Sequence, residues 1–376
     1  MVYLDYNATT PLCAEARSAM LPFLDGDFGN PSSIHAEGRR ARAGVDDARD
    51  RLAAVMGVRP HEIIFTGGGT ESCNLGVIGL ARAHAPKGKH IITSAIEHHA
   101  VLHACEYLQH FEGFEVSILP VDASGTVSPQ ALEECIRPDT TVVSVMHANN
   151  ETGAIQPLRE LAEVCARHGI FFHTDAVQTF GKMPVRPREL GVSALSIAAH
   201  KFYGPKGVGA LFLGAGIALS RTAHGGAHEG TRRPGTENVA GIAGMAAAAE
   251  ASSGESARLL PLREALWEAI RAACPEAIRN GDPERTLANT LNVSFPGADG
   301  EAFLIGLDLE GVCVSSGSAC MVGSIQPSHV LLAMGIPPET AMATVRFSLG
   351  NGTTERDVLQ ASGAVRRVLA LQPLAA

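Results

Sequence analysis

Residues 194–207 read ALSIAAHKFYGPKG, and this stretch decides the fold. The apolar run Ala194–Ala198 has the length of a buried strand, and Lys201 follows it just before a Gly/Pro turn. A lysine at the carboxyl end of a strand is desolvated, and a desolvated lysine is the usual Schiff-base nucleophile. Upstream, the run Ile170–Thr174 ends in Asp175. A lysine and a carboxylate on neighbouring strand ends fit pyridoxal phosphate, because the carboxylate keeps the pyridine nitrogen protonated while the lysine carries the aldehyde.

Short β-rich runs alternate with segments of helical spacing on both sides of this pair. The expected strands are Glu62–Thr66, Lys89–Thr93, Glu115–Pro120, Thr141–Met146, Ile170–Thr174, Ala194–Ala198 and Gly207–Leu213. The expected helices between them are Glu71–Ala85, His99–Phe111, Ser128–Ile136 and Leu158–His168. This alternation predicts an α/β fold with a mostly parallel seven-stranded sheet that helices cover on both faces.

The last third of the chain has a different pattern. The small polar stretch Ala251–Glu255 is the best candidate for a domain junction. Beyond it come a long helical pattern, further strand and helix patterns and a C-terminal helix, at Ala257–Ala273, Leu287–Phe295, Glu301–Leu309, Gly311–Ser316 and from Thr354. Since 376 residues are too many for one simple core, we expect two domains. These are a large α/β domain over residues 11–255 and a small α+β domain formed by residues 1–10 and 256–376.

Composition and charge exclude several classes of protein. A net charge of −9 with no basic run argues against DNA or RNA binding. The amino terminus lacks the basic start and apolar core of a signal peptide, and the longest near-apolar stretch, Ala240–Ala249, is too short to span a membrane. Eight cysteines without a CxxC pair indicate a reducing, cytoplasmic setting and no structural zinc site.

Polar residues follow five of the expected strands. They are Gly67–Thr70, Glu97–His99, His147–Glu151, Asp175 with Gln178, and His200–Lys201. In open α/β sheets, ligands bind beyond the carboxyl ends of the strands. We therefore expect these five groups to converge on one crevice.

The run Gly67-Gly68-Gly69-Thr70 leads into an expected helix. Free backbone N–H groups at a helix N-terminus bind phosphate, and the Thr70 hydroxyl adds a donor. An ordinary tight turn with a threonine cap is the alternative interpretation. A P-loop is excluded because no Gly-Lys-Ser/Thr follows.

Other strand-end residues suit the remaining parts of the cofactor. The His98 ring can stack on a pyridine ring and move protons. Asn150 and Gln178 are neutral hydrogen-bond donors that suit a phenolic oxygen, although turn formation or helix capping is their ordinary role. His200 can reach the phosphate. Lys206 is a rival to Lys201, but its Gly/Pro surroundings favour a surface turn.

Two residues of the last third are candidates for substrate chemistry. Cys320 lies in an uncharged stretch of small residues, which predicts a mobile, exposed loop and a nucleophilic thiol. The other cysteines, among them Cys313, fall in apolar or helical patterns and are assigned to packing. Arg346 lies in a strand pattern and needs an anionic partner, either a substrate carboxylate or an Asp or Glu of the chain.

Together, these motifs resemble those of the cysteine desulfurases of the NifS/IscS class, a branch of the fold-type-I pyridoxal-phosphate enzymes (class V aminotransferase-like). The resemblance covers nearly the whole chain. The motifs that carry it are YLDYNATT (3–10), FGNPSSIH (28–35), GTES (69–72), EHH (97–99), NNETG (149–153), HTDAVQ (173–178), HKFYGPKG (200–207), RPGTEN (233–238), SSGSAC (315–320) and VRFSL (345–349). The long run from Cys320 to Pro327-Ser328-His329 is similar to the longer-loop group of this class.

The resemblance implies a role for each candidate in holding pyridoxal phosphate. Lys201 would carry the cofactor covalently, Asp175 would pair with the pyridine nitrogen, and His98 would stack on the ring. Asn150 and Gln178 would lie near the ring hydroxyl. The phosphate group would be bound by Gly69, Thr70 and His200, and by Thr236 from the second subunit of a homodimer.

The resemblance also implies the reaction. Arg346 and Asn150 would bind the carboxylate of L-cysteine, and Cys320 would attack its sulfur. Alanine would leave, and the persulfide on Cys320 would pass to an acceptor protein such as an iron–sulfur scaffold. The loop motion expected for Cys320 suits this work, because the sulfur has to leave a buried cavity.

The chain departs from the family pattern in two places. Ala198 stands where the family often has a phosphate-binding serine, so one hydroxyl contact is expected to be missing. Met321 and Val322 follow Cys320 where a threonine is common, which leaves the acceptor open.

The sequence argues against three other functions. Transamination or selenocysteine lysis on the same fold would share the cofactor site, because the fold does not fix the chemistry, but neither needs Cys320 as much. A non-catalytic partner protein with this fold would lack Lys201 or Asp175, and both are present. An iron–sulfur protein needs clustered cysteines. The sequence therefore favours the desulfurase.

Overall fold

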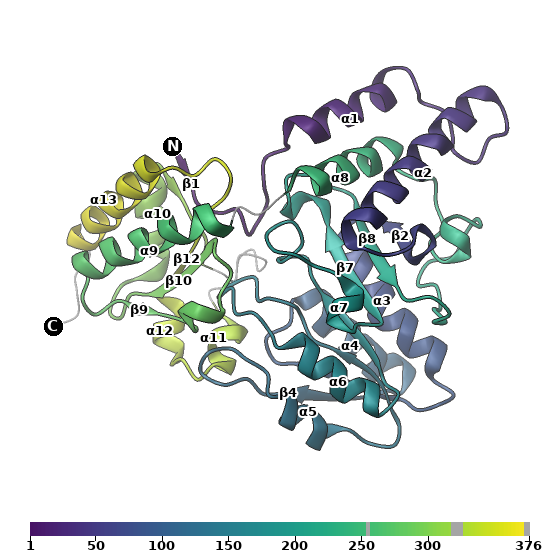
Figure 1. Cartoon of the computed structure of the whole chain (residues 1–376). Helices are drawn as coiled ribbons and strands as arrows, with labels where there is room; N and C mark the ends of the chain where they lie inside the picture. The colour runs from purple at the N-terminus through teal and green to yellow at the C-terminus, as the bar shows by residue number, and fades with distance from the viewer. Residues whose placement is uncertain (253–255, 317–325, 372–376) are drawn as a thin grey trace.

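A seven-stranded sheet forms the centre of the larger part of the protein (Figure 1). The structure is a computed structural model that describes residues 1–252, 256–316 and 326–371. The strand order is β2-β8-β7-β6-β5-β3-β4, and only the pairings made by β8 are antiparallel. The bounds are β2 Ile63–Thr66, β3 His90–Ser94, β4 Glu115–Leu119, β5 Thr140–Ser144, β6 Phe171–Asp175, β7 Ala194–Ala198 and β8 Gly209–Leu213. The prediction of a mostly parallel seven-stranded sheet is confirmed.

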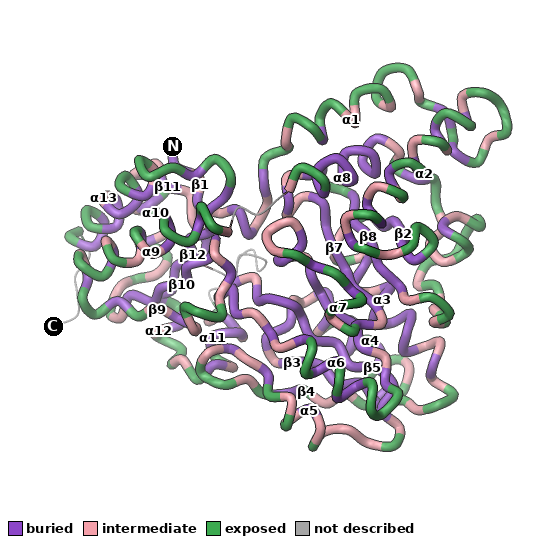
Figure 2. Tube along the Cα trace, viewed as in Figure 1, coloured by how far each residue is buried: buried purple, intermediate pink, exposed green. Residues whose placement is uncertain are grey.

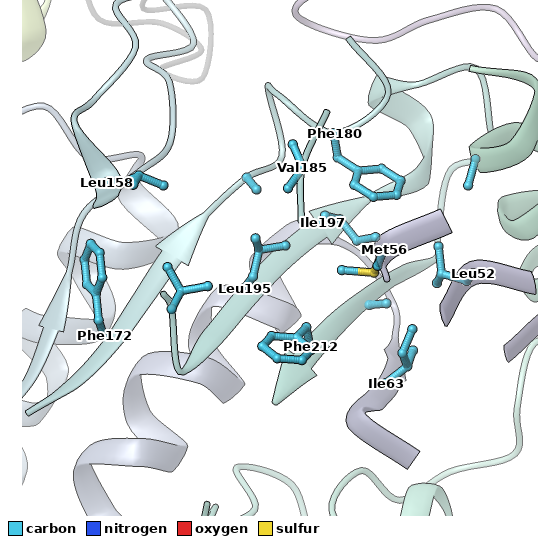
Figure 3. Packing of buried hydrophobic residues seen from close by; sticks show 14 of the residues in the cluster. Leu52, Met56, Ile63, Leu158, Phe172, Phe180, Val185, Leu195, Ile197 and Phe212 are labelled. Atoms are coloured by element: carbon cyan, nitrogen blue, oxygen red, sulfur yellow. The ribbon is translucent and has the colours of Figure 1, made fainter. Parts of the chain in front are cut away.

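Helices bury both faces of this sheet, as a parallel sheet requires. On one face, α3 (Gly69–His84) and α4 (His99–Glu112) share an apolar cluster with the strands. On the other, α2 (Ala36–Met56), α6 (Leu158–Arg167) and α8 (Val239–Ala251) do so. Figure 3 shows Leu52 and Met56 of α2 beside Ile63, Ile197 and Phe212 of the strands. Two shorter helices, α5 (Pro129–Cys135) and α7 (Pro187–Leu190), complete the connections between strands.

An outer helix, α1 (Ala14–Asp25), packs on α8. The sequence analysis assigned no helix to α1, α2 or α8. Helix α8 is buried along most of its length, as Figure 2 shows, and its sequence VAGIAGMAAAAEA has no polar face from which a helical period could be read. Its small residues let α1 approach closely, since a Cβ on Gly244 would lie 2.7 Å from the Cγ atom of Met20.

The smaller part of the protein has its own core. An antiparallel sheet has the order β12 (Thr344–Ser348), β10 (Thr290–Ser294), β9 (Ile278–Arg279), and β1 (Val2–Tyr3) pairs in parallel with β11 (Val312–Cys313). Three helices pack on these strands: α9 (Ser256–Ala273), α10 (Gly300–Leu309) and α13 (Glu355–Leu371). Short helices α11 (His329–Ala333) and α12 (Pro338–Met342) lie at the side near the large sheet (Figure 1).

The N-terminal segment runs from the small core to the large sheet. After β1, the Tyr6 N–H donates to the Ser348 carbonyl at 3.1 Å. Four residues later the Thr10 N–H donates to the His200 carbonyl at 3.0 Å. Residues 7–9 therefore lie beside the end of β7. The domain limits given above stay a prediction, and residues 253–255 of the expected junction lie outside the described residues.

Within the described part of the chain, every helix is too short or too polar to cross a lipid bilayer.

Candidate active site

A cavity of about 420 Å³ lies beyond the carboxyl ends of the parallel strands. Most of the side chains predicted from the sequence line it: Gly69, Thr70, His98, Asn150, Asp175, Gln178, His200, Lys201 and Arg346. The remaining wall comes from Asn7, Ala8, Cys73, Ala100, Met146, Ala148, Val177 and Ala198. The expected convergence of strand ends on one crevice is therefore confirmed, although the roles of the single residues are not tested by it.

Lys201 closes a short 3₁₀ turn, Ala199–Lys201, directly after β7. Its Nζ atom donates to the main-chain oxygens of Asn7 and Ala8 at 2.5 and 2.8 Å. These two carbonyls fix the amine at the wall of the cavity. The N-terminal segment thus helps to position the lysine. The sequence around Lys201 does not predict this contact.

Asp175 ends β6, the parallel neighbour of β7, and is paired in register with Ser196. The carboxyl group is buried, and its Oδ1 atom accepts from the Val177 N–H at 2.9 Å. Cys73 of α3 lies against it, and burial raises the pKa of this thiol well above 9.0. A buried carboxylate beside a neutral thiol can hold a proton on a ring nitrogen.

His98 is the N-cap of α4, and its Nδ1 atom accepts from the Ala100 N–H at 3.0 Å. Burial lowers the pKa of the His98 imidazole, with Lys201 adding to the shift. In the neutral ring the proton therefore lies on Nε2, because Nδ1 is used as an acceptor. A neutral ring with one N–H can both stack and pass a proton.

The start of α3 forms the opposite end of the cavity. Its N-cap Gly68 has φ 151°, a conformation that L-residues rarely adopt, and the first amides of a helix have no acceptor within it. Burial lowers the pKa of His200 to about 4, and its Nδ1 atom is 3.2 Å from Thr9 Oγ1. Ala198 offers only a methyl group here, and a Cβ on Gly69 would meet that methyl at 3.2 Å.

Arg346 enters from β12 of the small sheet and is buried. Its Nη2 atom forms an ion pair with Asp5 Oδ1 at 2.7 Å, and Nη1 donates to the Asn150 carbonyl at 2.9 Å. Its buried Nε atom has no partner among the described residues. The sequence left two partners open for Arg346, a substrate carboxylate or an acidic residue of the chain. The structure contains the ion pair with an acidic residue, and the Nε donor has no partner among the described residues.

Asn7 forms several of the hydrogen bonds in the cavity wall. Its main-chain oxygen accepts from Gln178 Nε2 at 3.0 Å as well as from Lys201. Its side chain accepts from Lys182 Nζ at 2.8 Å and donates to Thr290 Oγ1 at 2.9 Å. Asn7 therefore joins the small sheet to the end of β7.

Sequence reasoning missed Asn7, Asp5 and Lys182. The first two lie inside the quoted YLDYNATT motif, which was the only signal for them, and no role was given to either. Lys182 stands in a Gly-Lys turn that reads as surface. Their partners lie 4 to 341 residues away, and local patterns carry no information on most such contacts.

Three other candidates lie elsewhere. Thr236 is exposed and does not line the cavity of its own chain. Lys206 is exposed, as expected for a surface turn. Cys320 lies outside the described residues.

The residues present fit pyridoxal phosphate. A lysine amine and a buried carboxylate lie at adjacent strand ends, which is the donor set for its aldehyde and ring nitrogen. The glycine-capped start of α3 suits a phosphate, and the unpartnered Arg346 Nε atom suits a carboxylate.

Comparison with known proteins agrees with this geometry. Residues 2–360 match the family model described as Aminotransferase class-V. The cysteine desulfurase IscS of Dictyoglomus turgidum is 49% identical over 372 residues, which are 98% of this chain and 94% of that protein. The IscS of Methanosarcina thermophila is 46% identical over 95% of this chain and 89% of its own.

Solved structures give the same picture. A NifS-like protein has a TM-score of 0.92 at 37% identity, covering 98% of this chain and 99% of that one. A structure of SspA in complex with cysteine has a TM-score of 0.84 at 37% identity, with coverages of 93% and 99%. The similarity therefore extends over the segments that form both sheets.

Proposed function

The chain belongs to the class-V aminotransferase family and is a cysteine desulfurase of the IscS/NifS type, and from this premise we propose how its residues divide the reaction. L-cysteine binds in the cavity, its sulfur passes to the Cys320 thiol, and L-alanine leaves. The observation that carries the proposal is the cavity itself, which gathers Lys201, Asp175, His98 and Arg346 from four separate segments.

Pyridoxal phosphate is the cofactor that we place there. Lys201 would hold it covalently, Asp175 would pair with its ring nitrogen, and His98 would stack on the ring. Asn150 and Gln178 would bind its hydroxyl, and Gly69, Thr70 and His200 would bind its phosphate. Once bound, the group supplies an electron sink that weakens bonds near the α-carbon of an amino acid.

Arg346 and Asn150 bind the carboxylate of the substrate in this proposal. The Arg346 Nε donor has no partner among the described residues, and Arg346 lines the cavity, which together support a contact with the substrate carboxylate. The internal partner Asp5 keeps the guanidinium in place before substrate arrives. A held carboxylate orients the Cβ–Sγ bond of the substrate relative to the incoming thiol.

Proton movements are assigned to Lys201 and His98. The Lys201 amine lies against the Asn7 and Ala8 carbonyls, which accept hydrogen bonds from it and hold it in place while it exchanges a proton with the substrate. Because burial lowers the pKa of His98, its ring is neutral at pH 7 and can take up a proton from the substrate.

Sulfur transfer is balanced without an added oxidant. The Cβ–Sγ bond of cysteine breaks, an S–S bond forms with Cys320, and the alanine Cβ atom takes up a proton. The products are alanine and a persulfide of Cys320. Release of sulfide then needs an external thiol, which becomes oxidised to a disulfide.

We further propose a homodimer in which Thr236 of one subunit completes the phosphate site of the other. Its exposure and its distance from the cavity of its own chain support this, and so does the missing hydroxyl at Ala198. The sulfur acceptor is a protein such as an iron–sulfur scaffold. The cytoplasm suits a persulfide carrier, because thiols stay reduced there.

The test compares the wild type with Cys320→Ala. Alanine and sulfide released from L-cysteine in the presence of a thiol reductant are measured together with the cofactor absorbance. We expect equimolar products from the wild type and a loss of at least about 100-fold in Cys320→Ala, with the absorbance band unchanged. Cys313→Ala is the matched control and should keep its activity.

Full activity of Cys320→Ala would instead favour a selenocysteine lyase or an aminotransferase-type reaction. Selenocysteine and a keto acid acceptor would then be the substrates to try.

A further inference from the structure

A second lysine, Lys182, lies behind the wall of the cavity. It lies four residues after Gln178 and does not line the cavity itself. The residue is half-buried. The reaction outlined above gives this residue no role.

The Lys182 amine has two hydrogen-bond acceptors. Its Nζ atom donates to Asn7 Oδ1 at 2.8 Å and to Gln178 Oε1 at 3.0 Å. In the described part of the chain it forms no ion pair with a carboxylate. Burial lowers the pKa of Lys182 well below 10.5, and the charges of Lys201 and Arg346 add to this. The amine donates one hydrogen bond to each of the two acceptors.

The contact with Gln178 decides which end of that amide faces the cofactor site. Since Oε1 accepts from Lys182, the NH₂ group points the other way and donates to the Asn7 carbonyl. Without Lys182, only the bond from Nε2 to the Asn7 carbonyl fixes the orientation of this amide, so the amide turns over more easily and can present its oxygen instead. An oxygen there would repel the phenolic oxygen of the cofactor.

The contact with Asn7 works in the same direction. Asn7 Oδ1 accepts from Lys182 and from Asn289 Nδ2 at 3.0 Å, so its NH₂ group is left to donate to Thr290. The fixed Asn7 side chain holds its main-chain carbonyl beside Lys201. One buried amine thus orients two amides at the cavity wall.

We propose that Lys182 is a positioning residue that holds the NH₂ group of Gln178 toward the phenolic oxygen of pyridoxal phosphate and the Asn7 carbonyl beside Lys201. This inference rests on the proposed function, because it assumes that the cavity binds this cofactor.

The test is a double-mutant cycle on cofactor affinity. The dissociation constant of pyridoxal phosphate and its visible absorption band are measured for the wild type, Lys182→Met, Gln178→Met and the double variant. Methionine keeps the length of glutamine and nearly that of lysine, and it removes the polar end of each side chain. Lys87→Met, on an exposed residue, is the matched control.

We expect each single variant to bind the cofactor about 10-fold more weakly and to shift the band in the same direction. The double variant should be no weaker than Gln178→Met alone, since Lys182 acts largely through Gln178. Additive losses of about 100-fold, or a Lys182→Met variant with wild-type affinity and band, would overturn the proposal.

Gln178→Glu covers the case in which Lys182→Met does not fold. Its carboxylate satisfies Lys182 but offers an oxygen to the cavity, so affinity should fall at least about 10-fold with the fold retained. Unchanged affinity would overturn the proposal. If the wild type itself binds no pyridoxal phosphate, the proposed function fails, which is a separate outcome.

Discussion

Glu97, the residue before His98, is a carboxyl group enclosed at the base of the site. Its Oε1 atom accepts from Ser94 Oγ at 2.5 Å and from the Met146 N–H at 2.8 Å. Its Oε2 atom has no partner among the described residues. Burial raises the pKa of Glu97 to about 8, and Asp175 adds to the shift. The group is therefore mainly protonated at neutral pH.

This raised pKa makes stability depend on pH. Between about pH 4.5 and pH 8 the unfolded state has lost the Glu97 proton while the folded state keeps it, so raising the pH favours unfolding. The contribution is about 1.4 kcal/mol per pH unit and levels off above the folded pKa. Glu97→Gln has no such proton. As the pH rises, the free energy of unfolding of the variant should therefore increase relative to that of the wild type, by about 1.4 kcal/mol per pH unit.

Urea unfolding of the apoprotein at pH 5.5, 6.5 and 7.5 measures this difference. Glu106→Gln, on the exposed side of α4, is the surface control. Parallel stability curves for Glu97→Gln and the wild type would show that Glu97 ionises normally in the folded state.

Single residues differ in how much the sequence says about them. Lys201 and Asp175 were predictable because each follows an apolar run, and the ends of parallel strands meet at one edge of a sheet. Asn7 was not, since its partners Lys201 and Thr290 lie 194 and 283 residues further on. The ion pair between Arg346 and Asp5 joins residues 341 positions apart, so local sequence patterns could not predict it either.

At the scale of single elements, the turn between β2 and α3 places the start of a helix at the cavity. Strand β2 ends at Thr66, and α3 begins at Gly69. Gly68, between them, has φ 151° and ψ −175°, a region that is essentially open only to glycine. The turn exposes the first amides of α3 to the cavity.

Gly68→Ala tests this turn. An added Cβ would meet no atom within 4 Å, so the cost is that of the backbone conformation alone, about 1–3 kcal/mol. Gly26→Ala is the matched control, because its Cβ also meets no atom and its φ is −118°. Chemical unfolding should show the loss in Gly68→Ala only, together with weaker cofactor binding. If the two variants were equally stable, alanine would not be strained in the backbone conformation of Gly68.

Elements between strands were predictable to within one or two residues, because alternating strand and helix patterns differ in period. The strand expected at Ala194–Ala198 matches β7, and the helix expected at His99–Phe111 became α4, which ends at Glu112. Helix α8 could not be found in this way, since its sequence is apolar on all sides. Its partner α1 contains Pro22, which reads as a helix breaker.

At the scale of the whole molecule, the cavity lies where two separate cores meet. One apolar cluster lies between the large sheet and helices α2, α6 and α8, and another lies between the small sheets and helices α9, α10 and α13. The Asn7 network and Arg346 cross from one to the other. The similarity to known structures over at least 93% of this chain shows that this arrangement is shared.

The proposed dimer makes a prediction at this scale. Thr236→Ala should bind pyridoxal phosphate about 10-fold more weakly, because one hydrogen bond to the charged phosphate is lost. Thr236→Ser keeps the hydroxyl and should bind like the wild type. Light scattering reports the oligomeric state in parallel. A monomer with full affinity, or equal affinities of the two variants, would contradict a shared site.

The path of the N-terminal segment has a consequence for synthesis on the ribosome. Asn7 is made long before Ser348, yet its N–H donates to Ser348 Oγ, 341 residues later. At about 5–20 residues per second, the ribosome needs roughly 20 to 70 s to supply that partner. The Asn7 carbonyl that accepts from Lys201 can therefore reach its final position only after Ser348 has been made.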